Sequence, residues 1–173
     1  MTKGTYAAIN PERTHNYYII EHGISFSVGP FIIYPFNTEH DAVEPVGFLI
    51  SHPSQGKLIY ATDTFYLRYK FVNVNYYMVE CNYCHNILQE RRECGELDDL
   101  LYNRLMTSHM SLERTKEFLQ SCDLRRTRNI ILVHMSRDNS DIQSMVHQIQ
   151  TATGIPTTAA DKGKKIELSL YPF

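Results

Sequence analysis

The sequence predicts an α/β protein in which helices flank a mixed sheet. The first half of the chain contains short β-branched and aromatic runs separated by glycine and proline, a pattern typical of strands. The second half alternates segments of helical periodicity with a buried, strand-like run. The chain has 173 residues, about the size of one domain. We therefore expect residues 1–173 to form a single domain.

Five strands are expected in the first half of the chain. Each is a short run of apolar residues rich in isoleucine, valine, tyrosine and phenylalanine. The polar segment Ser-His-Pro-Ser-Gln-Gly at 51–56 indicates a hairpin turn between the third and fourth strands. The expected strands span residues 17–20, 31–34, 46–50, 57–61 and 76–80.

The second half predicts three main helices around one strand. Leucines recur at helical spacing over 97–105, and Ser111 is a suitable N-cap for a helix with Phe118 and Leu119 on its apolar face. The run 129–133 predicts a buried strand.

The C-terminal part predicts one more helix and two short strands. Residues 140–151 have apolar side chains at helical spacing, and Gly154 ends that helix. The short strands are expected around Ile155 and over 166–170.

Composition argues against several classes of protein. The chain has 17 Lys and Arg against 19 Asp and Glu, a formal net charge of −2, which disfavours a strongly basic nucleic-acid clamp. No apolar run approaches the roughly 18 residues of a transmembrane helix, and residues 1–6 lack the apolar core of a signal peptide. Four cysteines without an export signal are expected to be reduced thiols. We expect a cytoplasmic protein with no membrane partner.

Three ionisable residues follow expected strands. They are His40, Asp63 and His134. A strand that stops at a polar residue is a common way to place ligands on one rim of a sheet. Two imidazoles and a carboxylate suit zinc, manganese or iron. Taken singly, each residue is equally well explained as a turn or capping residue.

Five sequence blocks resemble the metallo-β-lactamase-fold hydrolases. The branch with the strongest similarity comprises bacterial proteins related to tRNA 3′-processing endonuclease and to cyclic-phosphate phosphodiesterases. The resemblance covers nearly the whole chain and implies the later part of an αββα sandwich. It also implies a metal-dependent hydrolase of phosphodiesters, with a nucleic-acid-like substrate. The blocks span residues 40–48, 61–64, 79–83, 104–111 and 132–139.

The resemblance implies roles for residues in four of the five blocks. His40 and His134 would be metal ligands, and Asp63 would bridge two divalent cations, zinc in the first place and manganese or iron otherwise. His109 would be the general acid that protonates the leaving oxygen. Arg104 would reach a phosphate of the substrate.

Two further residues are expected to support this site. Ser136 and Asn139 follow His134 closely and could orient its side chain or the loop around it.

One hallmark of the family is absent from the sequence. The N-terminal His-x-His-x-Asp-His motif supplies most ligands of one metal in the family, but the only histidines before His40 are His15 and His22, without its spacing. The sequence therefore predicts an N-terminally incomplete domain. It can be a fragment of a longer hydrolase, half of a split enzyme, or a degenerate member that binds without catalysis. Each case predicts self-association or a partner chain.

Three other signals are weaker. Thr64-Phe65 stands where the family has a small glycine after Asp-Thr, which predicts a bulkier wall beside the site. Cys81-x-x-Cys84-His85 satisfies a haem-attachment pattern, but haem attachment needs export, and a buried Cys81 at a strand end that runs into a helix explains the segment better. Short basic clusters suit either a solvated face or a nucleic-acid contact; they lie at 125–128 and 162–165.

Overall fold

The computed structural model describes residues 1–10, 12 and 17–171. His15, one of the two histidines that precede His40, lies outside the described residues.

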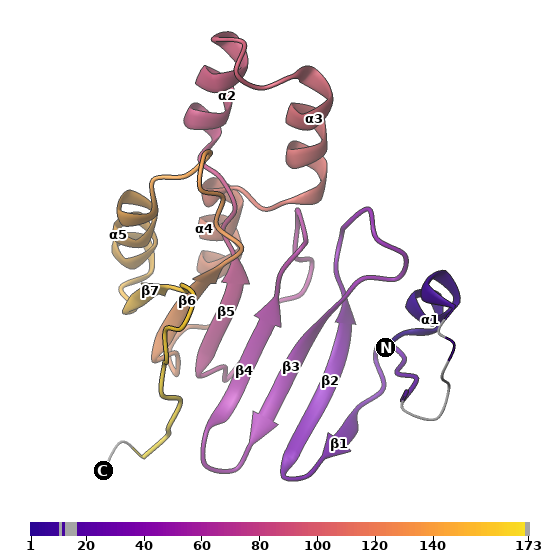
Figure 1. Cartoon of the computed structure of the whole chain (residues 1–173). Helices are drawn as coiled ribbons and strands as arrows, with labels where there is room; N and C mark the ends of the chain where they lie inside the picture. The colour runs from indigo at the N-terminus through magenta and orange to yellow at the C-terminus, as the bar shows by residue number, and fades with distance from the viewer. Residues whose placement is uncertain (11, 13–16, 172–173) are drawn as a thin grey trace.

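A seven-stranded sheet forms the centre of the protein, with the strands in sequential order (Figure 1). Strands β1 to β4 form an antiparallel meander, and β4 to β7 are parallel to one another. This is the mixed sheet that the sequence predicts. The strands are β1 (Phe26–Val28), β2 (Phe31–Asn37), β3 (Val46–His52), β4 (Gly56–Ala61), β5 (Tyr76–Glu80), β6 (Asn129–Val133) and β7 (Thr157–Ala159).

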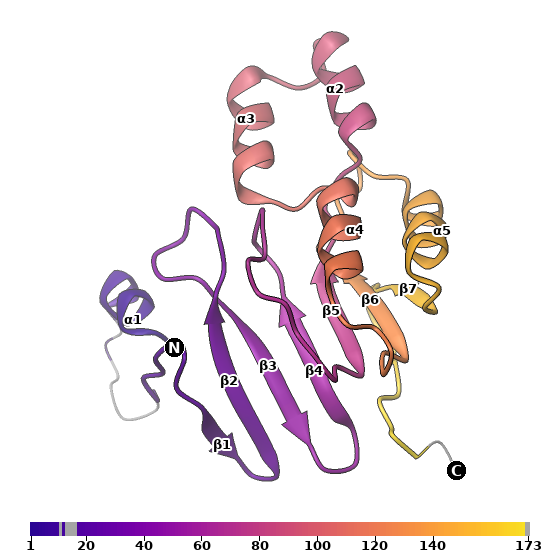
Figure 2. The ribbon, with the colours of Figure 1, turned by 180° about the vertical axis from the view of Figure 1, so that it is seen from behind.

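The helices occupy two places relative to the sheet. Helices α4 and α5 lie against one face of the parallel part (Figure 2), whereas α2 and α3 stand beyond the edge at which β4 and β5 end. The helices are α1 (Lys3–Ile9), α2 (His85–Glu93), α3 (Asp99–Ser108), α4 (Leu112–Ser121) and α5 (Ile142–Thr153).

Most of the predicted elements are confirmed. The four strand predictions from 31 to 80 correspond to β2 to β5, and 129–133 is β6. Ser111 caps α4, because its hydroxyl accepts a hydrogen bond from the Arg114 N–H at 3.3 Å. Gly154 ends α5 in the left-handed conformation at a φ of 70°.

The terminal strand predictions at 17–20 and 166–170 are wrong. Ile20 makes only an isolated bridge to Thr2, and β1 lies further along the chain, at 26–28. Residues 166–170 form no strand because the carbonyl of Ser169 accepts side-chain hydrogen bonds from Tyr76 and Arg128 in place of a ladder. The strand expected around Ile155 is β7, two residues later.

The main core lies between the sheet and helices α4 and α5. Side chains of β4, β5 and β6 alternate, so that one set points to the helices. The connection 62–75 between β4 and β5 covers the same face without forming a helix. The core includes Ile59, Tyr77, Val79, Ile130 and Leu132 of the sheet, Phe118, Leu119, Met145 and Ile149 of the helices, and Leu67, Phe71 and Val74 of the connection.

The opposite face of the antiparallel strands is apolar and only half-buried. The register places Ile33, Ile50 and Leu58 side by side there, next to Phe48. A hollow of about 400 Å³ lies over this face, between it and the N-terminal segment; its lining is Met1, Tyr17, Tyr18, Ile20, Phe26, Ile33, Phe48 and Ile50.

The topology brings several loops to one edge of the sheet. Strands β4, β5 and β6 are parallel, so their carboxyl ends share that edge, where ligand sites of α/β sheets commonly lie. Strand β2 runs in the same direction as β4, and its following loop, 38–45, reaches the same edge.

Across the described ranges, no helix is long and apolar enough to cross a membrane.

Gly56 and Gly95 offer a matched test of the packing at the opposite edge. Both have positive φ, +81° and +75°, but a Cβ at Gly56 would lie 2.2 Å from Oδ1 of Asn75, and a Cβ at Gly95 would meet nothing within 4 Å. We expect Gly56→Ala to lower the free energy of unfolding more than Gly95→Ala does, by about 1–3 kcal/mol. Urea unfolding of both variants measures the difference. Equal losses would show that Asn75 moves aside without cost.

Candidate metal centre

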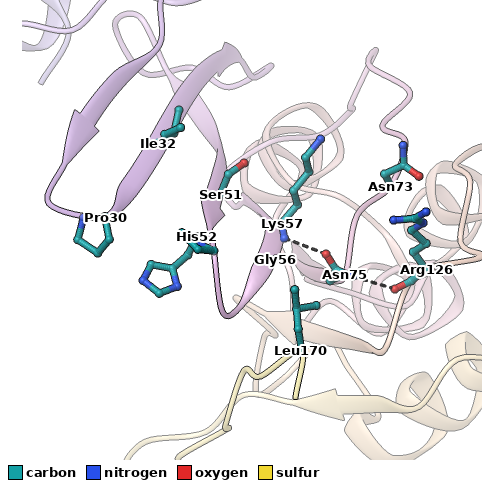
Figure 3. Close-up of a pocket in the computed structure, with 11 residues that line it drawn as sticks. Pro30, Ile32, Ser51, His52, Gly56, Lys57, Asn73, Asn75, Arg126 and Leu170 are labelled. Carbon is teal, nitrogen blue, oxygen red and sulfur yellow. Dashed lines mark hydrogen bonds between the residues drawn. The ribbon is translucent and has the colours of Figure 1, made fainter. Parts of the chain in front are cut away.

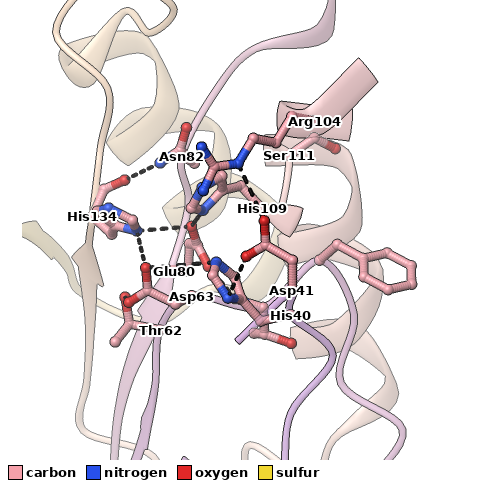
Figure 4. A network of polar contacts seen from close by, with 12 residues as sticks. His40, Asp41, Thr62, Asp63, Glu80, Asn82, Arg104, His109, Ser111 and His134 are labelled. Carbon is pink, nitrogen blue, oxygen red and sulfur yellow. Dashed lines mark hydrogen bonds and ion pairs between the residues drawn. The ribbon is translucent and has the colours of Figure 1, made fainter. Parts of the chain in front are cut away.

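The candidate site lies at the edge where β4, β5 and β6 end (Figure 4). Asp63 comes two residues after β4, Glu80 is the last residue of β5, and His134 directly follows β6. His109 is the C-cap of α3, and His40 lies in the loop after β2. The structure thus brings together the predicted residues His40, Asp63, His109 and His134, and adds Glu80.

Glu80 is at the centre of the network. Its side chain is 0% exposed. One oxygen, Oε1, lies 2.7 Å from Nδ1 of His109 and 3.0 Å from Nδ1 of His134. The other, Oε2, accepts a hydrogen bond from the Thr64 N–H at 2.7 Å. These three partners compensate the carboxylate for its loss of water.

Glu80 also affects the pKa of a neighbouring imidazole. The hydrogen bond to Glu80 raises the pKa of the His134 imidazole above its usual value, although the partial burial of the ring acts in the opposite direction.

Asp63 lies between two of the histidines. Its Oδ1 is 3.5 Å from Nδ1 of His134 and 4.0 Å from Nε2 of His40. Nδ1 of His40 accepts a hydrogen bond from the Ala42 N–H at 3.1 Å, so Nε2 is the ring nitrogen that faces Asp63. The ring of His109 contacts those of both other histidines, with centroids 5.5 Å from His40 and 4.9 Å from His134.

Two of these residues have an unusual backbone conformation. Asp63 and His134 have φ values of 52° and 54°, in the left-handed region that side chains with a Cβ rarely adopt. The surrounding hydrogen bonds hold them there: the carbonyl of His134 accepts from the Asn82 side chain at 2.7 Å, and Thr64 is bound to Glu80. Such conformations cluster at functional sites.

The loop that carries His40 is fixed to the loop that carries Asp63. The hydroxyl of Thr64 accepts a hydrogen bond from the Glu39 N–H at 3.0 Å, and the Phe65 N–H donates to the Glu39 carbonyl at 2.9 Å. These contacts join residues far apart in the sequence and determine the separation of His40 and Asp63.

The donor set fits a divalent cation. Two groups have all their donor atoms within 4.8 Å of one another: His40, Asp63 and His109, and Glu80, His109 and His134. Two ligands of one zinc ion in tetrahedral geometry are separated by about 3.4 Å, given metal–ligand bonds of roughly 2.0–2.2 Å. The donor atoms of Asp63 and His134 are 3.5 Å apart, and those of Asp63 and His40 are 4.0 Å apart. Neither group contains both His40 and His134, so these two histidines do not form one compact ligand set with Asp63, which lies between them. Imidazole and carboxylate donors suit zinc, manganese and iron alike.

Arg104 lies at the rim of the site and is paired with an acid. Its Nε donates to Oδ2 of Asp41 at 3.2 Å, and Oδ1 of Asp41 lies 3.0 Å from Nδ1 of His40. The guanidinium is mostly exposed and therefore accessible to a ligand above the site.

Ser136 and Asn139 act on the loop after β6. The Ser136 N–H donates to the carbonyl of Asn82 at 2.8 Å, and the Asn139 N–H donates to the Ser136 hydroxyl at 3.2 Å. The Asn139 side chain accepts from Arg91 at 2.6 Å. Within the described residues neither side chain is hydrogen-bonded to the His134 ring, so their influence on it is through the loop.

Phe65, the bulky residue that follows Asp63-Thr64, packs against Arg114. Its ring packs under the guanidinium of Arg114, whose carbon lies 5.2 Å from the ring centroid. Nη1 of Arg114 also donates to the carbonyls of Phe65 and Met106, at 3.4 and 3.2 Å.

The Cys-x-x-Cys segment lies inside the protein. Cys81 and Cys84 are buried free thiols. Burial raises the pKa of the Cys81 thiol to about 12, so it is protonated at neutral pH. Both residues behave as small core residues at the end of β5.

Two residues of the site, Glu80 and Asn82, are not predicted from the sequence. Glu80 ends an apolar strand, which is the same signal that singled out Asp63 and His134. Glu80 is also the last residue of the predicted strand 76–80, so the sequence does not mark it as a loop residue. The contact of Asn82 with His134 depends on the pairing of β5 with β6 and has no local signal.

The fold is that of the metallo-β-lactamase-fold proteins. No protein-family model matches the sequence, and no curated protein matches it. Solved structures do match, and those described next share only 10–14% of their residues with this chain, so the likeness concerns the fold.

Three of these structures illustrate the match. The metallo-β-lactamase fold protein YhfI from Bacillus subtilis has a TM-score of 0.63 and 14% identity, covering 85% of this chain and 52% of its own. Igni18, a metallo hydrolase from the archaeon Ignicoccus hospitalis, has a TM-score of 0.66 and 10% identity, covering 95% and 66%. A diphosphatase of the PhnP family has a TM-score of 0.53 and 11% identity, covering 87% and 49%. This chain therefore spans about half to two thirds of the length of these three structures.

Removing the Glu80 carboxylate tests the centre of the network. We expect Glu80→Ala to lower the free energy of unfolding by about 3–5 kcal/mol, because it leaves the Thr64 N–H and two imidazoles without their buried partner. Glu80→Gln keeps the shape and an acceptor oxygen and should cost less. Alanine at the exposed Glu90 is the control, with a change within about 0.5 kcal/mol. Thermal or urea unfolding measures all three variants, and similar losses for Glu80→Ala and Glu90→Ala would contradict the central role of Glu80.

Proposed function

We propose that this chain is a metal-dependent hydrolase of phosphodiester bonds. The proposal depends on one observation: three imidazoles and two carboxylates converge at the edge of the sheet where β4, β5 and β6 end. The solved structures with the same fold support the general class, since one is described as a metallo hydrolase and another as a diphosphatase. The phosphodiester substrate rests on the sequence blocks around these residues.

His40, Asp63 and His134 are the proposed metal ligands. Asp63 is close to both histidines, and its carboxylate is half exposed, so it is open to an ion. A divalent cation held there would polarise a phosphoryl oxygen and stabilise the charge that develops during hydrolysis.

His109 is the proposed proton donor. Its Nδ1 lies 2.7 Å from Oε1 of Glu80, so the carboxylate fixes the orientation of the ring. Nε2 is then the atom that gives its proton to the leaving oxygen. Glu80 is a positioning residue in this reaction, because it acts through His109.

Arg104 is the proposed contact for the substrate phosphate. A guanidinium binds phosphate oxygens in a paired geometry, and Arg104 would exchange part of its contact with Asp41 for the substrate. Ser136 and Asn139 would keep the loop of His134 in place.

A second candidate function is a non-catalytic binding or assembly module, either a remnant or half of a split enzyme. The half-buried apolar face formed by Ile33, Phe48, Ile50 and Leu58 favours it, because such a face suits association with a second copy or a partner chain. A partner could also add metal ligands to the edge.

Two substitutions separate the ligand role from the proton-donor role. We expect Asp63→Ala to lose the bound metal, as measured by elemental analysis after dialysis against metal-free buffer. We expect His109→Ala to keep the metal and to lower hydrolysis of bis(p-nitrophenyl) phosphate about 10²–10⁴-fold. The control is His147→Ala on the exposed side of α5, which should change neither quantity.

The measurements of metal content and hydrolysis distinguish the possible roles of His109 and the two candidate functions. Loss of metal in His109→Ala would make His109 a ligand with His40 and Asp63, a grouping that the geometry also allows. If the unaltered chain retains no metal and shows no hydrolysis, the enzyme proposal fails for this chain alone and the assembly module is favoured.

A further inference from the structure

Two adjoining hollows lie at the edge of the sheet where β4 to β6 begin, opposite the candidate metal centre (Figure 3). The first, of about 490 Å³, lies between Ile32 and Ser51 of the antiparallel strands, Lys57 and Arg126. The second, of about 450 Å³, adjoins it and contains Arg125, Arg126 and Arg128. Strand β4, six residues long, separates this edge from the candidate metal centre by about 17–20 Å.

Asn75 gives these hollows a rigid frame. Its Oδ1 accepts from the Lys57 N–H at 2.9 Å, and its N–H donates to the Lys57 carbonyl at 2.9 Å. Its Nδ2 donates to the Arg126 carbonyl at 3.3 Å, and its own carbonyl accepts from the Arg128 N–H at 2.8 Å. One residue therefore joins the β3–β4 hairpin to the loop before β6. These bonds use main-chain atoms of Lys57 and Arg126 and leave both side chains available.

The side chains of Lys57 and Arg126 extend into the same region. In Figure 3 the side chains of Lys57, Asn73 and Arg126 extend to the same side of Asn75. No Asp or Glu is among the described residues that line the two hollows. In the described part of the chain, neither Lys57 nor Arg126 has an acidic partner.

One neighbouring acid, Asp123, offsets the charge of Arg125, so the excess rests on Lys57, Arg126 and Arg128. Asp123 binds Arg125 through two hydrogen bonds, at 2.9 and 2.7 Å, and this contact lowers the pKa of Asp123 to about 2. Arg128 donates to the carbonyl of Ser169 at 3.2 Å and forms no ion pair with a described acidic residue. The chain as a whole has a formal charge of −2, so the cations gathered here are a local departure from the average.

We propose that this basic hollow binds the phosphate group of a nucleotide, either free or within a nucleic acid strand. Arg126 and Lys57 supply the charged hydrogen-bond donors for phosphate oxygens, with the Asn73 amide beside them. Pro30, Ile32 and Leu170 add an apolar surface that suits the base or sugar. The inference is independent of the proposed hydrolysis, because it involves none of the residues at the metal edge.

Calorimetric titration of the full chain, in buffer with EDTA, tests this site. The probes are adenosine 5′-monophosphate, a single-stranded thymidine decanucleotide and adenosine, which lacks phosphate. We expect saturable binding of at least one phosphate-bearing probe and none of adenosine. Tighter binding of the mononucleotide identifies a free nucleotide as the ligand, and tighter binding of the decanucleotide identifies a nucleic acid strand.

Three double variants locate the binding. Lys57→Ala with Arg126→Ala should weaken it by at least about ten-fold, since two charged contacts are lost. Lys162→Ala with Lys165→Ala removes the same charge from exposed positions outside the hollows and should leave the affinity unchanged. Lys57→Arg with Arg126→Lys keeps the charge and should retain binding.

Three results would overturn the proposal. They are no saturable binding by either phosphate-bearing probe, equal binding of adenosine, and an affinity that the loss of Lys57 and Arg126 leaves unchanged in a folded variant. None of these results bears on metal binding or hydrolysis at the other edge.

Discussion

The arrangement of the site depends on one fully buried carboxylate, that of Glu80. Glu80 contacts the loop after β4 through Thr64, the junction of α3 and α4 through His109, and the loop after β6 through His134. A charge so deeply buried is stable only while its partners stay in place. The same condition keeps the histidines and Asp63 close together. The parallel pairing of β4, β5 and β6 makes this possible, because it ends three strands at one edge.

Much of the fold could be predicted from the sequence, because the strands in the centre of the sheet are apolar runs with clear boundaries. The α/β fold, the mixed sheet and the strands from β2 to β6 follow from those runs. The ends of the chain were harder. Residues 17–20 have strand-like composition but find no neighbouring strand beyond an isolated bridge at Ile20, whereas the short β1 is paired because it follows the turn into β2.

The site was partly predictable for a similar reason. Asp63 and His134 each follow an apolar run, so their position at a strand end is a local property. His40 is different, because its approach to Asp63 depends on the contacts of Glu39 with Thr64 and Phe65 between two distant loops. Glu80 also ends an apolar run, but its immediate neighbours Val79 and Cys81 are not the polar residues that indicate a loop. Its importance becomes visible only through its three partners.

The connection 62–75 has a consequence for how this protein can change during evolution. It begins beside Asp63 at one edge of the sheet and ends at Asn75, which holds the frame of the other edge. Between these points Leu67, Phe71 and Val74 are anchored in the core. An inserted or deleted residue would therefore displace a side chain at one edge or the other. We expect substitutions to be tolerated at exposed positions of this segment such as Val72. Its length, in contrast, is constrained by the contacts at both of its ends.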